Sequence, residues 1–139
     1  MVVLAGDHVY QMDYRRLLAA HVQRDANVTV ACVQVPRAEA RHFGIVTIGD
    51  AGRITGFVEK PQGSLPSAGE TVLASMGVYV FKADYLYAQL AADAARSDSA
   101  HDFGRDLLPA AVAAGDAAAW LFQNPRTGQP GYWLSLIHI

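Results

Sequence analysis

Charged and small polar residues stand at the ends of apolar segments in this sequence, where folding can bring them together. The apolar run VVLA at 2–5 ends in Gly6-Asp7-His8. A carboxylate at the end of a strand can hold Mg²⁺, which prefers oxygen ligands and often shares its shell with phosphates. Gly6 lacks a side chain, so a ligand could approach the backbone closely. The alternative is that Asp7 forms a turn or caps a helix, and the residue alone does not decide between the two.

A second candidate is the acid–base pair Glu59-Lys60, which is followed by Pro61. A carboxylate accepts hydrogen bonds from sugar hydroxyls, and an ammonium is a compact charge for a phosphate. Adjacent strand residues point to opposite faces, so both can serve one ligand only where the strand bends, and Pro61 favours a bend. The simpler alternative is an exposed charged pair at a hairpin end.

Three further residues could contribute to such a site, and each has a structural alternative. Ser75 interrupts an apolar run, where its hydroxyl either bonds the backbone or faces a polar ligand. Gly44 marks either a close backbone approach or the start of a hairpin. Asp102 lies in HDFG at 101–104, whose match to a kinase motif is accidental because the other kinase signatures are absent. A helix N-cap is the plain interpretation of Asp102.

The elements that must position these residues follow from apolar periodicity. Asp13 is expected to cap a helix with Leu17, Leu18 and Val22 on its apolar face. Strand, helix and strand in that order predict a right-handed βαβ unit with parallel strands. The expected strands are 2–5 (buried), 28–35, a hairpin at about 44–48 and 53–59, 72–81 and 117–123, and the expected helices are 14–25, 82–96 and one that follows Asp102 and stops at Gly115.

Composition narrows the class of protein. The chain has 139 residues, of which 52% are hydrophobic, so it can bury a real core. Its formal net charge is −2 and its Lys and Arg residues are scattered, so the sequence indicates no basic patch that would bind nucleic acid or an anionic membrane. No stretch of it is long enough to span a bilayer, and its first residues lack the basic flank and cleavage site expected of a signal peptide. Cys32 is its single cysteine, expected as a core thiol, and the sequence suits a soluble cytoplasmic domain.

The two ends of the chain lead us to expect a truncated domain. The sequence opens inside an apolar strand and closes on LSLIHI, an apolar hexapeptide without a turn or polar cap. We therefore expect a partial domain at 1–133 and a non-native tail at 134–139.

Several of these segments together resemble the bacterial ADP-glucose pyrophosphorylases, also called glucose-1-phosphate adenylyltransferases. The matching stretches, in the family's order, are LAGDHVYQMDY, TVACVQVP, HFGIV, GFVEKP, LASMGVYVF, ADYLY and HDFGRDLLP. A strand ending in GD and the VEKP sequence recur across sugar nucleotidyltransferases, whereas LAGDH, ASMGVYVF and HDFGRDLLP point to the ADP-glucose branch. The resemblance implies an α/β fold, a Rossmann-like nucleotidyltransferase (GT-A-like) with a mixed sheet flanked by helices, truncated at both ends.

The resemblance also implies a reaction, in which ATP and glucose 1-phosphate give ADP-glucose and pyrophosphate in glycogen biosynthesis. Asp7 would help to hold Mg²⁺ and Lys60 would hold the sugar phosphate, which makes these two the expected catalytic residues. The positions that match contacts to glucose 1-phosphate are Gly44, Glu59, Lys60, Ser75 and Asp102, with Glu59 and Ser75 on the glucose hydroxyls.

Two departures from the family pattern limit what the chain is expected to do. The Gly-rich loop that wraps the ATP phosphates would precede residue 1, and the family's Arg-Asp-Val-Gly after Trp133, whose Asp is the second metal ligand, is replaced by LSLIHI. We therefore expect the chain to be inactive alone, although the resemblance implies a homotetramer for the full-length protein. The alternatives are a sister sugar-1-phosphate nucleotidyltransferase using another nucleotide, and a non-catalytic sugar-phosphate-binding remnant.

Overall fold

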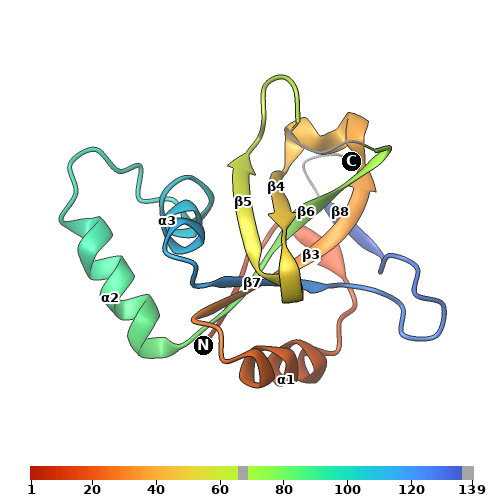
Figure 1. Cartoon of the computed structure of the whole chain (residues 1–139), viewed down its shortest axis with the longest axis horizontal. Helices are drawn as coiled ribbons and strands as arrows, with labels where there is room; N and C mark the ends of the chain where they lie inside the picture. Colours follow the sequence, from red (N-terminus) through yellow and green to blue (C-terminus); the bar gives the residue numbers. More distant parts are fainter. Residues whose placement is uncertain (66–68, 136–139) are drawn as a thin grey trace.

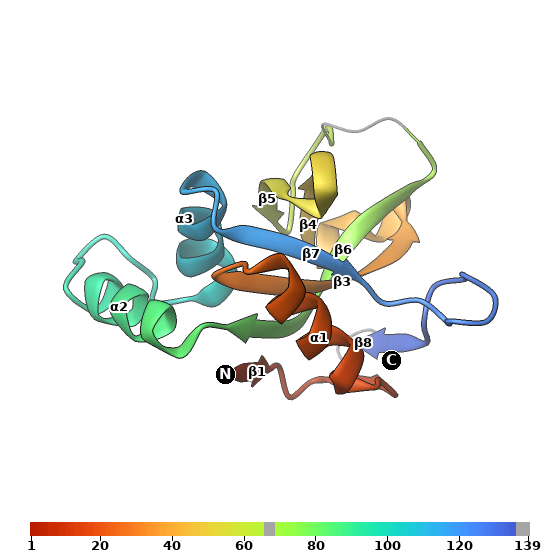
Figure 2. The same ribbon diagram turned by 60° about the horizontal axis from the view of Figure 1, so that its bottom comes forward.

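A computed structural model describes residues 1–65 and 69–135, which form a mixed sheet with helices on both sides (Figures 1 and 2). The strands are β1 Val2–Leu4, β2 His8–Tyr10, β3 Val28–Pro36, β4 Gly44–Ile48, β5 Ile54–Glu59, β6 Thr71–Phe81, β7 Ala117–Leu121 and β8 Trp133–Ser135. The helices are α1 Tyr14–Arg24, α2 Ala83–Ala94 and α3 Leu108–Ala113, with 3₁₀ turns η1 Arg37–His42 and η2 Asp50–Gly52 and a π-helical turn η3 Phe103–Leu107.

The main sheet runs in the order β5-β4-β6-β3-β7, and β1 also pairs with β6. Strand β7 is parallel to β3, whereas β6 is antiparallel to β1, β3 and β4, so the sheet is mixed. A separate antiparallel pair joins β2 and β8. This arrangement confirms the expected α/β class with a mixed sheet flanked by helices.

The relation between β1 and β3 differs in one respect from the simplest βαβ unit. Both strands are antiparallel to β6, so they run in the same direction, but β6 lies between them. The strand at 2–5 is also not buried as expected, since Val2 is 38% and Leu4 49% exposed. The reason is that β1 pairs with β6 along one edge only.

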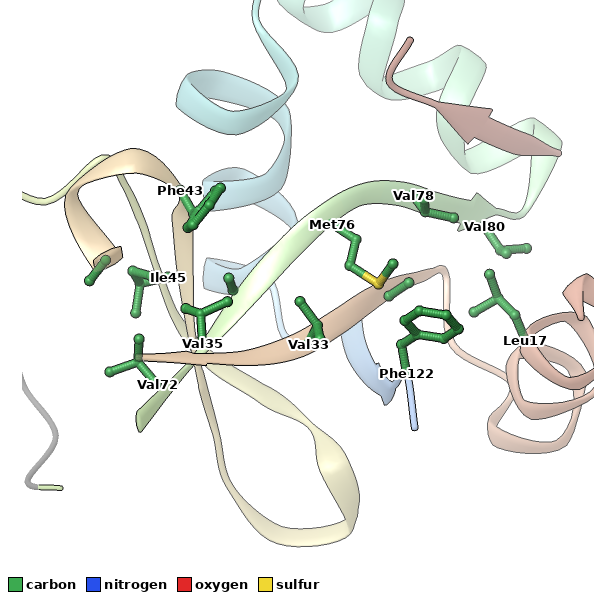
Figure 3. Close-up of a cluster of buried hydrophobic side chains, with 13 residues drawn as sticks. Leu17, Val33, Val35, Phe43, Ile45, Val72, Met76, Val78, Val80 and Phe122 are labelled. Carbon is green, nitrogen blue, oxygen red and sulfur yellow. The ribbon is translucent and has the colours of Figure 1, made fainter. Parts of the chain in front are cut away.

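Side-chain alternation along β3 supplies a core to each face of the sheet. Val33 and Val35 point into a cluster closed by Leu17 of α1 and Phe122 (Figure 3). Val28, Val30 and Cys32 point the other way, into a cluster closed by residues of α2 and α3, namely Leu86, Leu108 and Ala111. Period-two alternation puts these sets on opposite faces, so α1 covers one face and α3 the other.

The cap of α1 is as expected, but its buried face is not. The Asp13 carboxylate accepts the Arg15 backbone N–H at 3.1 Å and so caps the helix. Leu17 is fully buried, whereas Leu18 is 39% and Val22 76% exposed. The second buried position is His21, four residues after Leu17, whose Nδ1 lies 2.8 Å from Thr29 Oγ1 of β3. That hydrogen bond satisfies the polar ring, and burial lowers the pKa of His21.

Most other expected elements form near their expected positions. The hairpin of β4 and β5 turns through η2, where Ala51 and Gly52 adopt positive φ values of 55° and 74°. Leu134 and Ser135 continue β8, while residues 136–139 of the expected tail lie outside the described residues, so the boundary at 133 stays a prediction. Among the described helices, none is long and apolar enough to cross a membrane.

Candidate functional site

A cavity of about 300 Å³, here called the site cavity, lies where β2, β4, β5, β6 and the turn before η3 meet. Its size is at the lower end of the range typical of small-molecule sites. A larger hollow of about 1040 Å³ lies between α1 and the segment after β7, but none of the predicted site residues lines it. The site cavity is lined by all six of them, from five separate segments: Asp7, Gly44, Glu59, Lys60, Ser75 and Asp102.

A backbone bend lets neighbouring residues Glu59 and Lys60 line the same cavity. Glu59, the last residue of β5, pairs with Gly44 in the antiparallel register. Lys60 then adopts a left-handed φ of 45°, and its N–H donates to the Phe43 carbonyl at 3.0 Å. A lysine in this region is strained, and such strain persists where the surroundings impose it, often at ligand sites. The bend falls at Lys60, one residue before Pro61.

The Glu59 carboxylate is half-buried and held closely by two glycines. A Cβ added at Gly104 would lie 2.5 Å from Glu59 Oε2, and one at Gly44 would lie 2.9 Å from the same oxygen. Burial raises the pKa of Glu59; the Lys60 ammonium opposes this shift and the Asp102 carboxylate reinforces it. Within the described part of the chain the carboxylate accepts no hydrogen bond, so it is available to hydroxyl donors.

A bulge in β6 brings Ser75 and Tyr79 together at the cavity wall. Between the register pairs Cys32–Ser75 and Val30–Tyr79, β6 carries two more residues than β3. Gly77 within this segment has a φ of 70°. The Ser75 hydroxyl donates to Tyr79 Oη at 3.5 Å and accepts the Gly77 N–H at 3.4 Å. Both bonds are long, so they occupy the hydroxyl only weakly and leave it able to bind a polar ligand.

Asp102 combines a structural role with a place at the cavity. Its carboxylate accepts the Arg105 backbone N–H at 2.9 Å, which makes it the N-cap of η3, as its plain interpretation predicts. Its own N–H donates to the Asp106 carboxylate at 3.1 Å, so the two acids cap the turn reciprocally. The residue is exposed and lines the site cavity as well. Capping uses one carboxylate oxygen of Asp102, so the other can accept a hydrogen bond from a ligand in the site cavity.

Asp7 provides a single, half-exposed carboxylate to the lining of the site cavity. It lies between β1 and β2, its side chain is 51% exposed, and its Oδ1 lies 3.5 Å from His8 Nε2. A Cβ added at Gly6 would meet nothing within 4 Å, so the backbone beside Asp7 is open. Two polar atoms across the β2–β8 pair, His8 Nδ1 and Ser135 Oγ, are buried without a hydrogen-bond partner in the described residues.

The fit of a divalent metal to these residues is partial. In residues 1–65 and 69–135, no three His, Cys, Asp or Glu side chains converge as metal ligands. Mg²⁺ nevertheless often binds through one or two carboxylates and completes its shell with waters and substrate phosphates. Asp7 alone therefore suits a metal ion that the substrate helps to hold.

Sequence reasoning missed several residues that line the same cavity. They include His8, Gly77, Tyr79, Gly104 and Ser135. Tyr79 follows Ser75 by four residues within one strand, a spacing that places side chains on one face and could have identified it. Gly104 and Ser135 carried no comparable signal, because their proximity to the cavity depends on long-range packing.

Comparisons with known proteins bear on the whole chain. The model of the nucleotidyl transferase family ("Nucleotidyl transferase") matches residues 1–135. A glucose-1-phosphate adenylyltransferase of Granulibacter bethesdensis is 50% identical over 126 residues, covering 89% of this chain and 30% of that protein. Those of Nitrosococcus oceani and Vibrio cholerae are 46% and 44% identical, each over 96% of this chain and 32% and 34% of their own length. The chain thus spans about a third of these curated relatives.

Proposed function

The chain belongs to the nucleotidyl transferase family, and we propose that it is part of a glucose-1-phosphate adenylyltransferase of glycogen biosynthesis, acting in the cytoplasm. One observation carries the proposal: the five residues matched to a glucose 1-phosphate site line one cavity together with Asp7, which is matched to a metal ligand. The naming of the relatives at 44–50% identity favours ATP over other nucleotides. The fully buried Cys32, the single cysteine of the chain, is compatible with a reducing compartment.

The proposed reaction is a direct displacement. A phosphate oxygen of glucose 1-phosphate attacks the α-phosphorus of ATP; the bond to the β-phosphate bridging oxygen breaks, and pyrophosphate leaves. The sugar phosphate is already a nucleophile, so alignment and charge neutralisation suffice, without a covalent enzyme intermediate. Members of this family generally use a divalent metal, which we propose to be Mg²⁺ here; such an ion would neutralise phosphate charge and would be held in part by Asp7.

Each cavity residue has a proposed task that its surroundings support. Lys60 is exposed at the bend and would neutralise the sugar phosphate. The half-buried Glu59 and the Ser75 hydroxyl would bind glucose hydroxyls, while Asp102 would lie beside the sugar. Gly44 leaves room for the Glu59 carboxylate.

The first test is binding of glucose 1-phosphate to the 139-residue chain, followed by titration calorimetry. We expect saturable binding that Lys60→Ala weakens about tenfold or more, because a charge-assisted bond contributes roughly 1.5–3 kcal/mol. Lys82→Ala is the matched control, since Lys82 pairs with Asp25 and does not line the cavity. Equal loss in both variants, or no binding by the unaltered chain, would contradict the assignment.

The second test concerns catalysis and the nucleotide. The protein from the longest reading frame that contains this chain is assayed for ADP-glucose with ATP, UTP, dTTP or GTP. ADP-glucose formed only from ATP with Mg²⁺ supports the proposal, whereas a product from another nucleotide would indicate a sister enzyme. We expect the 139 residues alone to bind but not to release pyrophosphate. Binding without catalysis by the longest product would favour a sugar-phosphate-binding remnant.

A further inference from the structure

Asp93, near the end of α2, is a buried carboxylate that the proposed reaction does not use. Only 8% of the residue is exposed. One oxygen accepts the Ser99 hydroxyl at 2.6 Å, and the other lies 2.8 Å from His101 Nδ1. Hydrogen bonds to a carboxylate at these lengths are strong. We call Asp93, Ser99 and His101 the Asp93 cluster.

The Asp93 cluster closes the loop that leads into Asp102. The loop leaves α2 after Ala94 and returns to η3, and both contacts of Asp93 are made by its last residues. His101 holds a left-handed φ of 56°, and its N–H donates to Ser99 Oγ at 3.0 Å. This backbone is uncommon for a non-glycine residue, and the contacts of Ser99 and Asp93 with His101 help to hold it. The cluster therefore sets the direction in which the chain enters Asp102.

The position of α2 makes this connection important. Helix α2 begins beside the sheet, where Leu86 is buried in the core, and its far end extends away from the sheet (Figure 1), while the helix also contacts η3. Phe103 is held separately, because its ring stacks on Tyr79 at 5.8 Å. Loss of the cluster should thus loosen the turn at Asp102 and Gly104 while this stack remains. Gly104 abuts the Glu59 carboxylate, so a small displacement there reaches the site cavity directly.

We propose that Asp93 is a positioning residue for the sugar end of the site cavity: through Ser99 and His101 it holds the Asp102 turn against Glu59. This inference rests on the proposed function, because it assigns the Asp102 and Glu59 side of the cavity to a sugar. Lys60 lies on the β5 bend and does not depend on the cluster. The affinity for the sugar should therefore depend on Asp93, and the affinity for the phosphate should not.

The experiment compares two ligands on the 139-residue chain by NMR titration, glucose 1-phosphate and inorganic phosphate. Asp93→Asn is expected to weaken glucose 1-phosphate binding about tenfold and to leave phosphate binding within twofold. Ser99→Ala, which removes one of the two bonds, should give a smaller loss in the same direction. Asp98→Asn is the matched control: it makes the same change in the loop that follows α2, but Asp98 is exposed and pairs with Arg96.

The possible outcomes distinguish failure of this inference from failure of the proposed function. Equal weakening of both ligands by Asp93→Asn would show a general structural role and overturn the inference, as would unchanged binding of both. If Asp93→Asn does not fold, Ser99→Ala provides the same comparison. Failure of the unaltered chain to bind glucose 1-phosphate would refute the proposed function first, and the inference with it.

Discussion

At the scale of single residues, Glu59 is the position where stability and binding oppose each other. Its carboxylate is half-buried, has no hydrogen-bond donor among the described residues, and lies close to the Asp102 carboxylate. Burial without such a partner penalises the charged form. Residues kept at such a cost are typical of functional sites.

We expect Glu59→Gln to stabilise the fold at pH 7 and to weaken glucose 1-phosphate binding about tenfold. Because the folded pKa of Glu59 lies above its ordinary value of 4.5, the folded chain retains a proton that the unfolded chain has lost. The free energy of unfolding of the unaltered chain therefore falls as pH rises from 4.5 through the folded pKa of Glu59. Above the folded pKa of Glu59, the Glu59→Gln variant should melt about 1–3 °C higher than the unaltered chain. Below pH 4 the two melting temperatures should be equal. Melting curves from pH 3.5 to 7.5 measure the difference.

A destabilising effect of Glu59→Gln would contradict this prediction. If Glu59→Gln lowers the melting temperature at pH 7, the carboxylate is stabilised in the fold and its raised pKa is wrong. Glu39→Gln provides the control, since Glu39 lies in η1 and does not line the site cavity.

At the scale of elements, β6 organises both the sheet and the site. It pairs with three strands and carries Ser75 and Tyr79 on either side of the bulge. Gly77 makes the bulge possible, because its φ is 70° and a Cβ there would lie 2.8 Å from the Ala5 Cβ. A side chain at this position would meet both a strained backbone and a clash with Ala5, which directly follows β1.

Gly77→Ala should therefore destabilise the chain by about 2 kcal/mol or more, from the left-handed backbone and the clash with Ala5 together. Urea denaturation followed by circular dichroism measures the loss. Gly56→Ala in β5 is the matched control: its φ is not positive and its nearest neighbour, Thr47 Oγ1, would lie at an ordinary 3.4 Å. A similar loss in both variants would show that the bulge does not require glycine.

At the scale of the whole molecule, strand β3 lies between two cores. Cys32 is fully buried in one of them, and burial raises the pKa of its thiol to about 12. A thiol reacts as its thiolate, so native Cys32 should be inert. We expect labelling by a thiol reagent at pH 8 to follow global unfolding in urea. Rapid labelling in native buffer, before any loss of circular dichroism, would show that the core opens locally.

Local signals in the sequence predicted much of the fold. The Asp13 cap, the turn between β4 and β5, and the Asp102 cap depend on residues within a few positions of each other, so short patterns identify them. Residue types and positions made six residues candidates, resemblance to a family gave them their expected roles, and the structure gathers them in one cavity. Their chemical roles stay predictions.

What only the tertiary structure decided depends on contacts between distant segments. The sequence by itself determined most strand and helix positions, caps and turns, because these follow from the chemistry of residues close together in the chain. It did not predict the paired strands β2 and β8. It did not indicate that β6 separates β1 from β3, that α1 buries His21 in place of Val22, or that Asp93 holds the turn at Asp102. Periodicity marks which face of an element is apolar, whereas the partner of that face is chosen by packing and hydrogen bonding across the whole fold.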